Sequence, residues 1–179
     1  MYYPLMLKVK GEPCLVVGGG SVALQKARAL RRAGADVTVV SPVFTSALRR
    51  LRVRRIARRF RTGDVARRIL VIAATDDPKV NRAVFSACRR RSIPVNVVDV
   101  PELCSFIVPS ILRRGPVVIA VSTGGQSPSL AKALRRQLEA LVPASIGRTA
   151  LRLGRERRRL LRALPPSPAR TRLLKGLVR

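Results

Sequence analysis

The sequence predicts an α/β protein built on a parallel sheet, and three observations lead to this fold class. An apolar strand over residues 15–17 runs into three glycines and then into a helix over residues 22–32. A second apolar strand follows over residues 37–40, after Gly34 ends that helix. Further apolar strands alternate with helices along the chain, over residues 69–74, 94–98 and 116–121. Such alternation favours parallel strands joined by right-handed crossovers.

The turn after the first strand matches the dinucleotide fingerprint G-x-G-x-x-[G/A] at Gly18, Gly20 and Ala23. In that motif the first glycine permits a tight turn, the second lets the backbone approach a pyrophosphate, and the third small residue packs helix on strand. The amino end of the helix then offers free N–H groups to phosphates. An ordinary strand-to-helix turn has the same spacing, so this motif alone leaves both interpretations open.

We expect NAD to bind outside the carboxyl ends of these strands, as ligands do in open parallel sheets. The residue after the second strand, where an acid would hold the ribose hydroxyls of NAD, is Ser41. No arginine follows immediately to favour a 2′-phosphate, so the choice between NAD and NADP stays open. Asp76 and Asp77 follow the strand over residues 69–74, and one of them is also expected to be the N-cap of the next helix. The cofactor-binding residues expected here are Gly18, Gly19, Gly20, Ser21, Val22, Ser41, Pro42, Val43, Thr75, Asp76 and Asp77.

Two further polar segments follow predicted strands. Asp99 comes after the strand over residues 94–98 and is expected to face the same crevice. The alternative is a turn residue or an ion-pair partner for an arginine. The substrate-binding candidates Ser122, Thr123, Gly124 and Gly125 form either an anion cradle or an ordinary turn. The helix over residues 129–141 that follows has an apolar face suited to core or dimer packing.

The composition narrows the class of protein. The formal charge is +28, from 37 Lys plus Arg against 9 Asp plus Glu, and the basic residues are dispersed along the chain. Aromatic residues make up only 3%, which argues against a stacking platform for single-stranded nucleic acid, although duplex binding remains an alternative. The three cysteines have no C-x-x-C spacing and histidine is absent, so no metal site is expected. The amino terminus does not read as a signal peptide and no apolar run could span a bilayer, so a cytoplasmic protein is expected.

Several ordered motifs together resemble the precorrin-2 dehydrogenase family, to which the amino-terminal part of siroheme synthase belongs. They are Val-Val-Gly-Gly-Gly-Ser-Val-Ala at 16–23, Ala-Ala-Thr-Asp-Asp at 73–77, Asn-Val-Val-Asp at 96–99, and Val-Ser-Thr-Gly-Gly-Gln-Ser-Pro at 121–128. The resemblance covers residues 3–145. It implies a Rossmann-type sheet with a small α+β dimerisation domain and a short helical tail. The corresponding domains are residues 1–112 for NAD binding, 113–143 for dimerisation and 144–179 for the arginine-rich tail.

The implied reaction is the NAD-dependent oxidation of precorrin-2 to sirohydrochlorin. The hydride goes to NAD and the proton to Asp99, which matches the family's proposed catalytic aspartate. The expected partners are this anionic tetrapyrrole and a second copy of the chain. Some relatives also insert ferrous iron, and a non-catalytic NAD-sensing domain is a further alternative. The family's tail is usually longer than the segment after Pro143, which favours dehydrogenase activity alone.

Overall fold

The computed structural model describes residues 2–177, which form two compact units that divide between Val108 and Pro109. The first unit contains the parallel sheet and the second contains a hairpin and three helices. Each unit is described by itself below. Within residues 2–177, no helix is both long and apolar enough to cross a membrane.

The first unit is built on a five-stranded parallel sheet in the order β3-β2-β1-β4-β5. Its strands are β1 (Pro13–Val17), β2 (Asp36–Ser41), β3 (Arg54–Ala57), β4 (Leu70–Ala73) and β5 (Val95–Val97). Val17 pairs with Val40 on one side and with Ala73 on the other, so the three central strands end level. The strand order switches direction between β1 and β4, the point where ligands bind in such sheets. The predicted Rossmann-type fold is confirmed.

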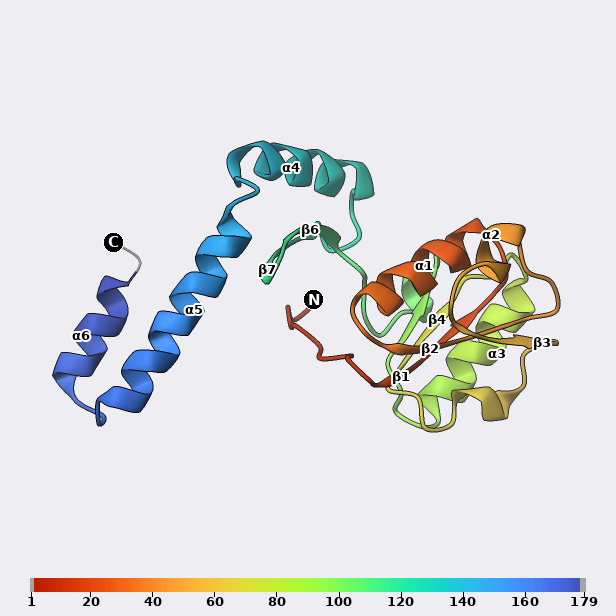
Figure 1. Ribbon diagram of the computed structural model, residues 1–179. Coiled ribbons are helices and arrows are strands. Elements are labelled where there is room, and N and C mark those ends of the chain that lie inside the picture. The colour runs from red at the N-terminus through yellow and green to blue at the C-terminus, as the bar shows by residue number, and fades with distance from the viewer. Residues whose placement is uncertain (1, 178–179) are drawn as a thin grey trace. The chain divides into compact units, whose positions relative to one another are not determined.

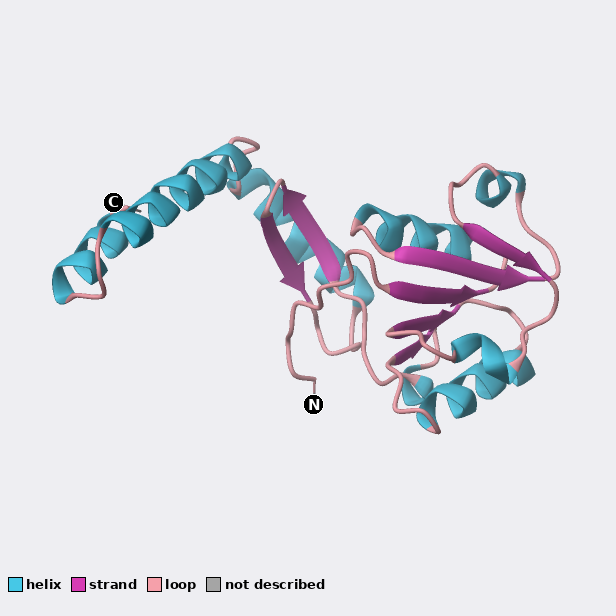
Figure 2. Ribbon diagram, turned by 60° about the horizontal axis from the view of Figure 1, so that its bottom comes forward, coloured by secondary structure: helices cyan, strands magenta, loops and turns pink. Residues whose placement is uncertain are grey.

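Helices cover both faces of this sheet (Figure 1 and Figure 2). Helix α1 (Ser21–Arg32) and the short α2 (Ser46–Arg49) share an apolar cluster with Cys14 and Val16 of β1. Helix α3 (Pro78–Arg89) shares a second cluster with Leu15 and Val17. Two short 3₁₀ turns, η1 (Thr62–Val65) and η2 (Pro101–Leu103), lie in the connections. Successive β1 side chains thus enter opposite clusters, which explains why a strand buried on both faces has an uninterrupted apolar sequence.

The edge strand β3 was not predicted, because its sequence RRIA lies within a run of arginines. Only Ile56 is half-buried and the other three residues are exposed, as an edge strand allows. Beyond β3, Arg58 donates from both terminal nitrogens to the two carboxylate oxygens of Asp64, at 2.8 and 2.6 Å. This bidentate bond to Arg58 holds the pKa of Asp64 below its ordinary value. The pair therefore stays ionised at neutral pH and fixes the segment after β3.

The second unit begins with an antiparallel hairpin of β6 (Ser110–Arg114) and β7 (Val117–Val121), followed by α4 (Pro128–Leu141). Helix α4 begins one residue before the predicted range of 129–141, and the Ser127 hydroxyl caps it by accepting a hydrogen bond from the Leu130 N–H. The sequence predicted β7 and missed β6. The β6 sequence SILRR is too polar to be read as an apolar strand, and only Leu112 in it is buried.

The tail differs from the short helices expected after Pro143. Helix α5 (Ile146–Ala163) has 18 residues, and α6 (Pro168–Gly176) packs beside it after a proline-rich break. Arginine and leucine are strong helix formers, so this arginine-rich segment propagates as one long helix. The first turn of α5 meets the hairpin at Gly147, which is buried, and a Cβ there would lie 2.6 Å from the Arg114 carbonyl oxygen.

We predict that Gly147→Ala destabilises the protein by about 1–3 kcal/mol, because the added methyl group would push α5 away from the β6 backbone. Gly154→Ala in the same helix is the matched control, since a Cβ there would meet only the end of the Arg158 side chain at 3.6 Å. That control should be stabilising by about 0.5–1 kcal/mol through helix propensity. Urea titration followed by circular dichroism measures both changes. Equal effects of the two substitutions would contradict the close contact at Gly147.

Candidate functional site

The glycine turn is fixed between the loops that follow the two neighbouring strands. The Gly18 N–H donates to the Val40 carbonyl oxygen at 2.9 Å, and its φ of 127° is one that residues with a side chain rarely adopt. A Cβ on Gly18 would overlap the Ala74 carbonyl oxygen just after β4. A Cβ on Gly19 would likewise overlap the Val43 carbonyl oxygen in the loop after β2. The absence of side chains at both positions brings these three loops into backbone contact.

Gly20 differs from the other two glycines, because a Cβ there would meet no atom within 4 Å. Its extended backbone forms the N-cap of α1, and no side chain caps the helix. The first turn contains no acidic residue, and Ser21 and Val22 are exposed. Ala23 is fully buried against the sheet, as the fingerprint requires. The structure thus leaves an uncapped, positively polarised helix end with open space beside it, which suits a phosphate group.

The loop after β2 has a buried polar side chain and exposes only apolar side chains at its first positions. Ser41 is buried, and its hydroxyl donates to the Val43 carbonyl oxygen at 2.7 Å. Pro42 and Val43 are exposed. The Thr45 N–H donates to the Gly19 carbonyl oxygen at 2.9 Å, which ties this loop to the glycine turn. The Ser41 side chain therefore shapes the loop, and its hydroxyl is engaged within it.

The segment after β4 is held by Asn81, a residue of α3 that the sequence reasoning did not assign to the site. Asn81 is buried, donates to the Thr75 carbonyl oxygen at 3.0 Å, and has its own amide oxygen 2.9 Å from the Thr75 hydroxyl. Asp77 caps α3 by accepting hydrogen bonds from the N–H groups of Lys79 and Val80. The expectation that one of the two acids is an N-cap is confirmed for Asp77. The sequence did contain a signal for this role, because Asn81 is the one polar residue on the buried, otherwise apolar face of α3.

Asp99 follows β5 at the same edge of the sheet. The Val98 N–H donates to the Ala73 carbonyl oxygen at 2.9 Å, which joins the ends of β5 and β4. Asp99 is exposed and has a φ of 60°, in the left-handed region that aspartate tolerates better than most residues. Asp99 is the first residue after this hydrogen bond between β5 and β4. The carboxylate is therefore carried on a short turn anchored to the sheet.

The four substrate-binding candidates lie in the second unit. The Ser122 hydroxyl accepts from the Gly124 N–H at 3.1 Å, and the Thr123 hydroxyl bonds both the N–H and the carbonyl oxygen of Ser127 at 3.0 Å. These bonds shape the turn between β7 and α4. Gly124 and Gly125 have positive φ, and a Cβ on either would meet no atom within 4 Å. The turn is thus ordered by its own side chains and open at its glycines.

The three cysteines are free thiols without the features of a catalytic group. Burial raises the pKa of Cys14 and of Cys88 to about 11, so both stay protonated at neutral pH. Cys104 is half-buried and donates to the carbonyl oxygens of Val97 and Val100. Within residues 2–177, no three His, Cys, Asp or Glu side chains are grouped as metal ligands.

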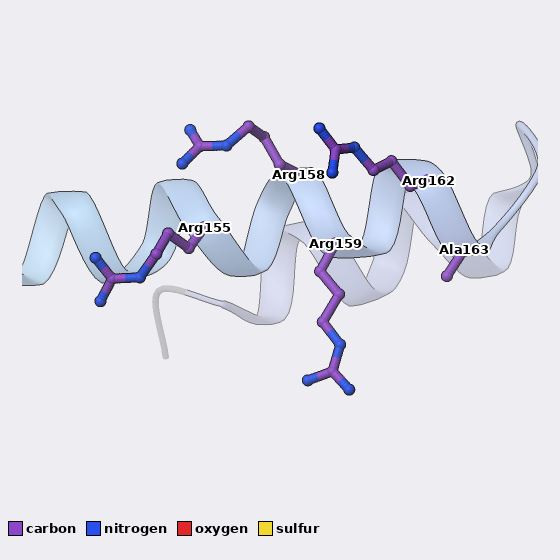
Figure 3. Close-up of a pocket in the computed structure, with 5 residues that line it drawn as sticks. All are labelled: Arg155, Arg158, Arg159, Arg162 and Ala163. Carbon is purple, nitrogen blue, oxygen red and sulfur yellow. The ribbon is translucent and has the colours of Figure 1, made fainter.

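A second set of positive charges lies on α5, outside the glycine turn. Arg155, Arg158, Arg159 and Arg162 extend from this helix in different directions (Figure 3), and none forms an ion pair with the rest of the described chain. They lie around a shallow surface hollow together with Ala163. The residues expected to bind the cofactor and the proton acceptor Asp99 thus lie in the first unit, and this arginine-lined hollow lies in the second.

Known proteins similar to this chain combine the same two parts. Residues 5–110 match the family model described as "Putative NAD(P)-binding", and residues 114–141 match the model described as "Sirohaem biosynthesis protein central". The siroheme synthase of Thioalkalivibrio sulfidiphilus is 52% identical over 143 residues, which is 78% of this chain and 29% of that protein. The siroheme synthase of Nitrosomonas eutropha is 53% identical over 144 residues, or 78% of this chain and 30% of that protein. The chain thus spans less than a third of the length of these curated relatives.

A solved structure extends the similarity to the whole fold. The structure of "SirC, precorrin-2 dehydrogenase" superposes with a TM-score of 0.80 and covers 99% of this chain and 90% of its own, at 27% sequence identity. The match of the NAD(P)-binding model to more than half of the chain, together with these relatives, defines the family. The chain belongs to this NAD(P)-binding family, and it continues into a segment that matches the sirohaem biosynthesis central model.

Proposed function

We propose that this protein oxidises precorrin-2 to sirohydrochlorin with NAD as the hydride acceptor, in the cytoplasm, as part of siroheme synthesis. The observation that carries the proposal is the open, uncapped end of α1 beside Gly20, in a chain whose fold matches a precorrin-2 dehydrogenase over 99% of its length. Oxidation removes two hydrogens from the tetrapyrrole, one as a hydride and one as a proton. The protein must therefore hold a dinucleotide and provide a proton acceptor beside it.

The dinucleotide is assigned to the crevice at the carboxyl ends of β1, β2 and β4. The backbone of Gly18–Val22 would hold the pyrophosphate, since Gly20 leaves space and no side chain caps the first turn of α1. Ser41–Val43 border the adenosine side, and Thr75–Asp77, positioned by Asn81, border the nicotinamide side. When bound, NAD supplies the hydride acceptor. The protein contributes a rigid frame, because Gly18 and Gly19 bring the loops after β4 and β2 into backbone contact with the glycine turn.

Asp99 is assigned as the group that accepts the proton. Its carboxylate is exposed on the turn beyond β5, at the edge of the sheet where the cofactor is placed. Asp76, also exposed, has no side-chain hydrogen bond within the described chain and is assigned to the cofactor. In this proposal Asp76, after β4, faces the cofactor, and Asp99, after β5, faces the substrate.

The proposed substrate is a polycarboxylate, and the turn Ser122–Gly125 is assigned to its carboxylates. Gly124 and Gly125 leave their backbone accessible, since no atom lies within 4 Å of where a Cβ would stand. Arginine guanidinium groups bind carboxylates by paired hydrogen bonds. The large excess of arginine therefore favours the binding of this anion.

The second unit is also assigned to dimer formation. Ala131 of α4 is buried on the hairpin, whereas Leu130, Leu134 and Leu141 of the same helix are 51%, 39% and 76% exposed. Exposed leucines on one helix indicate a surface that is covered by another chain. A second copy of this protein would cover it symmetrically.

Gly20→Asp should abolish NAD binding while the protein keeps its fold. The new side chain has open space, so it does not strain the turn, but its charge occupies and repels the pyrophosphate position. Calorimetry measures NAD affinity, and circular dichroism measures the thermal midpoint. Gly63→Asp, at another glycine with open space, is the control and should bind NAD like the parent. Unchanged NAD affinity in folded Gly20→Asp would remove this site from the proposal.

Asp99→Asn should leave NAD affinity within about twofold of the parent and lower sirohydrochlorin formation about a hundredfold or more. Asparagine also tolerates the left-handed backbone at this position, so the turn is preserved, but it cannot accept the proton. Asp36→Asn, at the amino end of β2, is the control and should retain full turnover. Parental turnover by Asp99→Asn would assign Asp99 a structural role only.

Leu134→Lys should convert a dimer into a monomer at micromolar concentration, because it places a charge in the proposed apolar interface. Leu173→Lys on α6, at a leucine that is 51% exposed, is the control and should leave the mass unchanged. Sedimentation equilibrium gives the mass of each variant. A monomeric parent protein would contradict the assignment of α4.

A further inference from the structure

The turn that carries Asp99 is closed by one long backbone hydrogen bond. The Val100 N–H donates to the Val97 carbonyl oxygen at 3.3 Å, so residues 97–100 form a four-residue turn. Asp99 is the third residue of this turn, and its φ of 60° lies in the left-handed region. A residue with a side chain keeps such a conformation only where the surrounding structure imposes it. The bond is longer than is usual between these groups, so other contacts must help to hold the turn.

The thiol of Cys104 bonds both ends of this turn. Its sulfur accepts from the Val97 N–H at 3.2 Å, and its S–H faces the carbonyl oxygens of Val97 at 3.1 Å and of Val100 at 3.3 Å. One side chain thus joins the first and fourth residues of the turn, with Asp99 between them. Burial raises the pKa of this thiol, so it stays protonated at neutral pH and keeps the proton that it donates.

The residues beside Cys104 fix it to β5, the outer strand on this side of the sheet. The Ser105 hydroxyl accepts from the Val95 N–H at 2.8 Å, and the Ser105 N–H donates to the Val95 carbonyl oxygen at 2.8 Å. The buried Asn96 donates to the Phe106 carbonyl oxygen at 3.0 Å. The segment that contains Cys104 therefore lies along the outer edge of β5, and the thiol has a fixed position relative to the sheet.

We propose that Cys104 is a positioning residue for Asp99, because its thiol joins the two ends of the turn and thereby directs the Asp99 carboxylate. The inference rests on the proposed function, since it takes Asp99 as the proton acceptor. A proton acceptor works only within hydrogen-bond reach of the proton that it removes. A displacement of about 1 Å lowers the rate of an oriented reaction by up to about a hundredfold. Without the thiol, the long bond between Val97 and Val100 is left to close the turn, and the carboxylate is less well directed.

The first test is the turnover of Cys104→Ala in the full chain. Sirohydrochlorin formation should fall about tenfold or more, with the KM for precorrin-2 and the NAD affinity within about twofold of the parent. Cys104→Ser keeps a donor and an acceptor, so it should restore turnover to within about threefold of the parent. Cys88→Ala is the matched control and should keep parental turnover, because Cys88 is buried in the same apolar cluster against which Cys104 packs.

Two further measurements separate positioning of Asp99 from a general structural effect. In the Asp99→Asn background, Cys104→Ala should lower the remaining turnover by less than about twofold, because the carboxylate that the thiol directs is already absent. Amide hydrogen exchange at Val100, which needs no substrate, should become about fivefold faster or more in Cys104→Ala. The same amide should exchange at the parental rate in Cys88→Ala.

Parental turnover by Cys104→Ala, or unchanged exchange at Val100, would overturn the inference and leave the proposed function intact. A loss in the double variant equal to the product of the two single losses would also overturn it, because the thiol would then act independently of Asp99. Loss of NAD affinity in both Cys104→Ala and Cys104→Ser would overturn it as well, since Cys104 would then support the whole unit. Parental turnover by Asp99→Asn would remove the proposed proton acceptor and the inference with it.

Discussion

The close backbone contact of Gly18 and Gly19 with the neighbouring loops is the constraint on which the rest of the first unit depends. Gly18 lies against Ala74 after β4, and Gly19 lies against Val43 after β2, so neither position has room for a side chain. These contacts draw the ends of three strands together and leave α1 free to begin at Gly20 with its N–H groups unpaired. The same loops that are locked in this way carry the residues assigned to the cofactor, so the packing that closes the fold also builds the site.

Charge is distributed around this frame in two ways. Within the sheet unit the acids are either structural, as Asp64 with Arg58 and Asp77 at the start of α3, or exposed at strand ends, as Asp76 and Asp99. Arginines outnumber these acids and mostly lack partners, which creates a positive field for anionic ligands. A dinucleotide and a polycarboxylate tetrapyrrole are both anions, so one field favours both. Under the proposed function, the exposed carboxylates of Asp76 and Asp99 face the cofactor and accept the proton, roles that a cation cannot perform.

The sequence was informative where local patterns determine structure. Apolar runs predicted four of the five parallel strands of the first unit and strand β7 of the second unit, and the glycine spacing predicted the turn at Gly18. Elements whose stability comes from tertiary position were missed, because β3 and β6 are polar edge strands that only their partners define. Asn81 was overlooked as a support of Thr75, because its hydrogen bonds to Thr75 form only where α3 packs beside the end of β4.

An anaerobic absorbance assay of the purified chain with precorrin-2 and NAD decides whether this fold oxidises the tetrapyrrole. The spectrum of sirohydrochlorin should grow in step with the absorbance of the reduced nicotinamide, at equal molar amounts, since each oxidation delivers one hydride. Appearance of neither product, in a protein that binds the dinucleotide by calorimetry, would contradict the account and indicate a dinucleotide-binding domain without this activity.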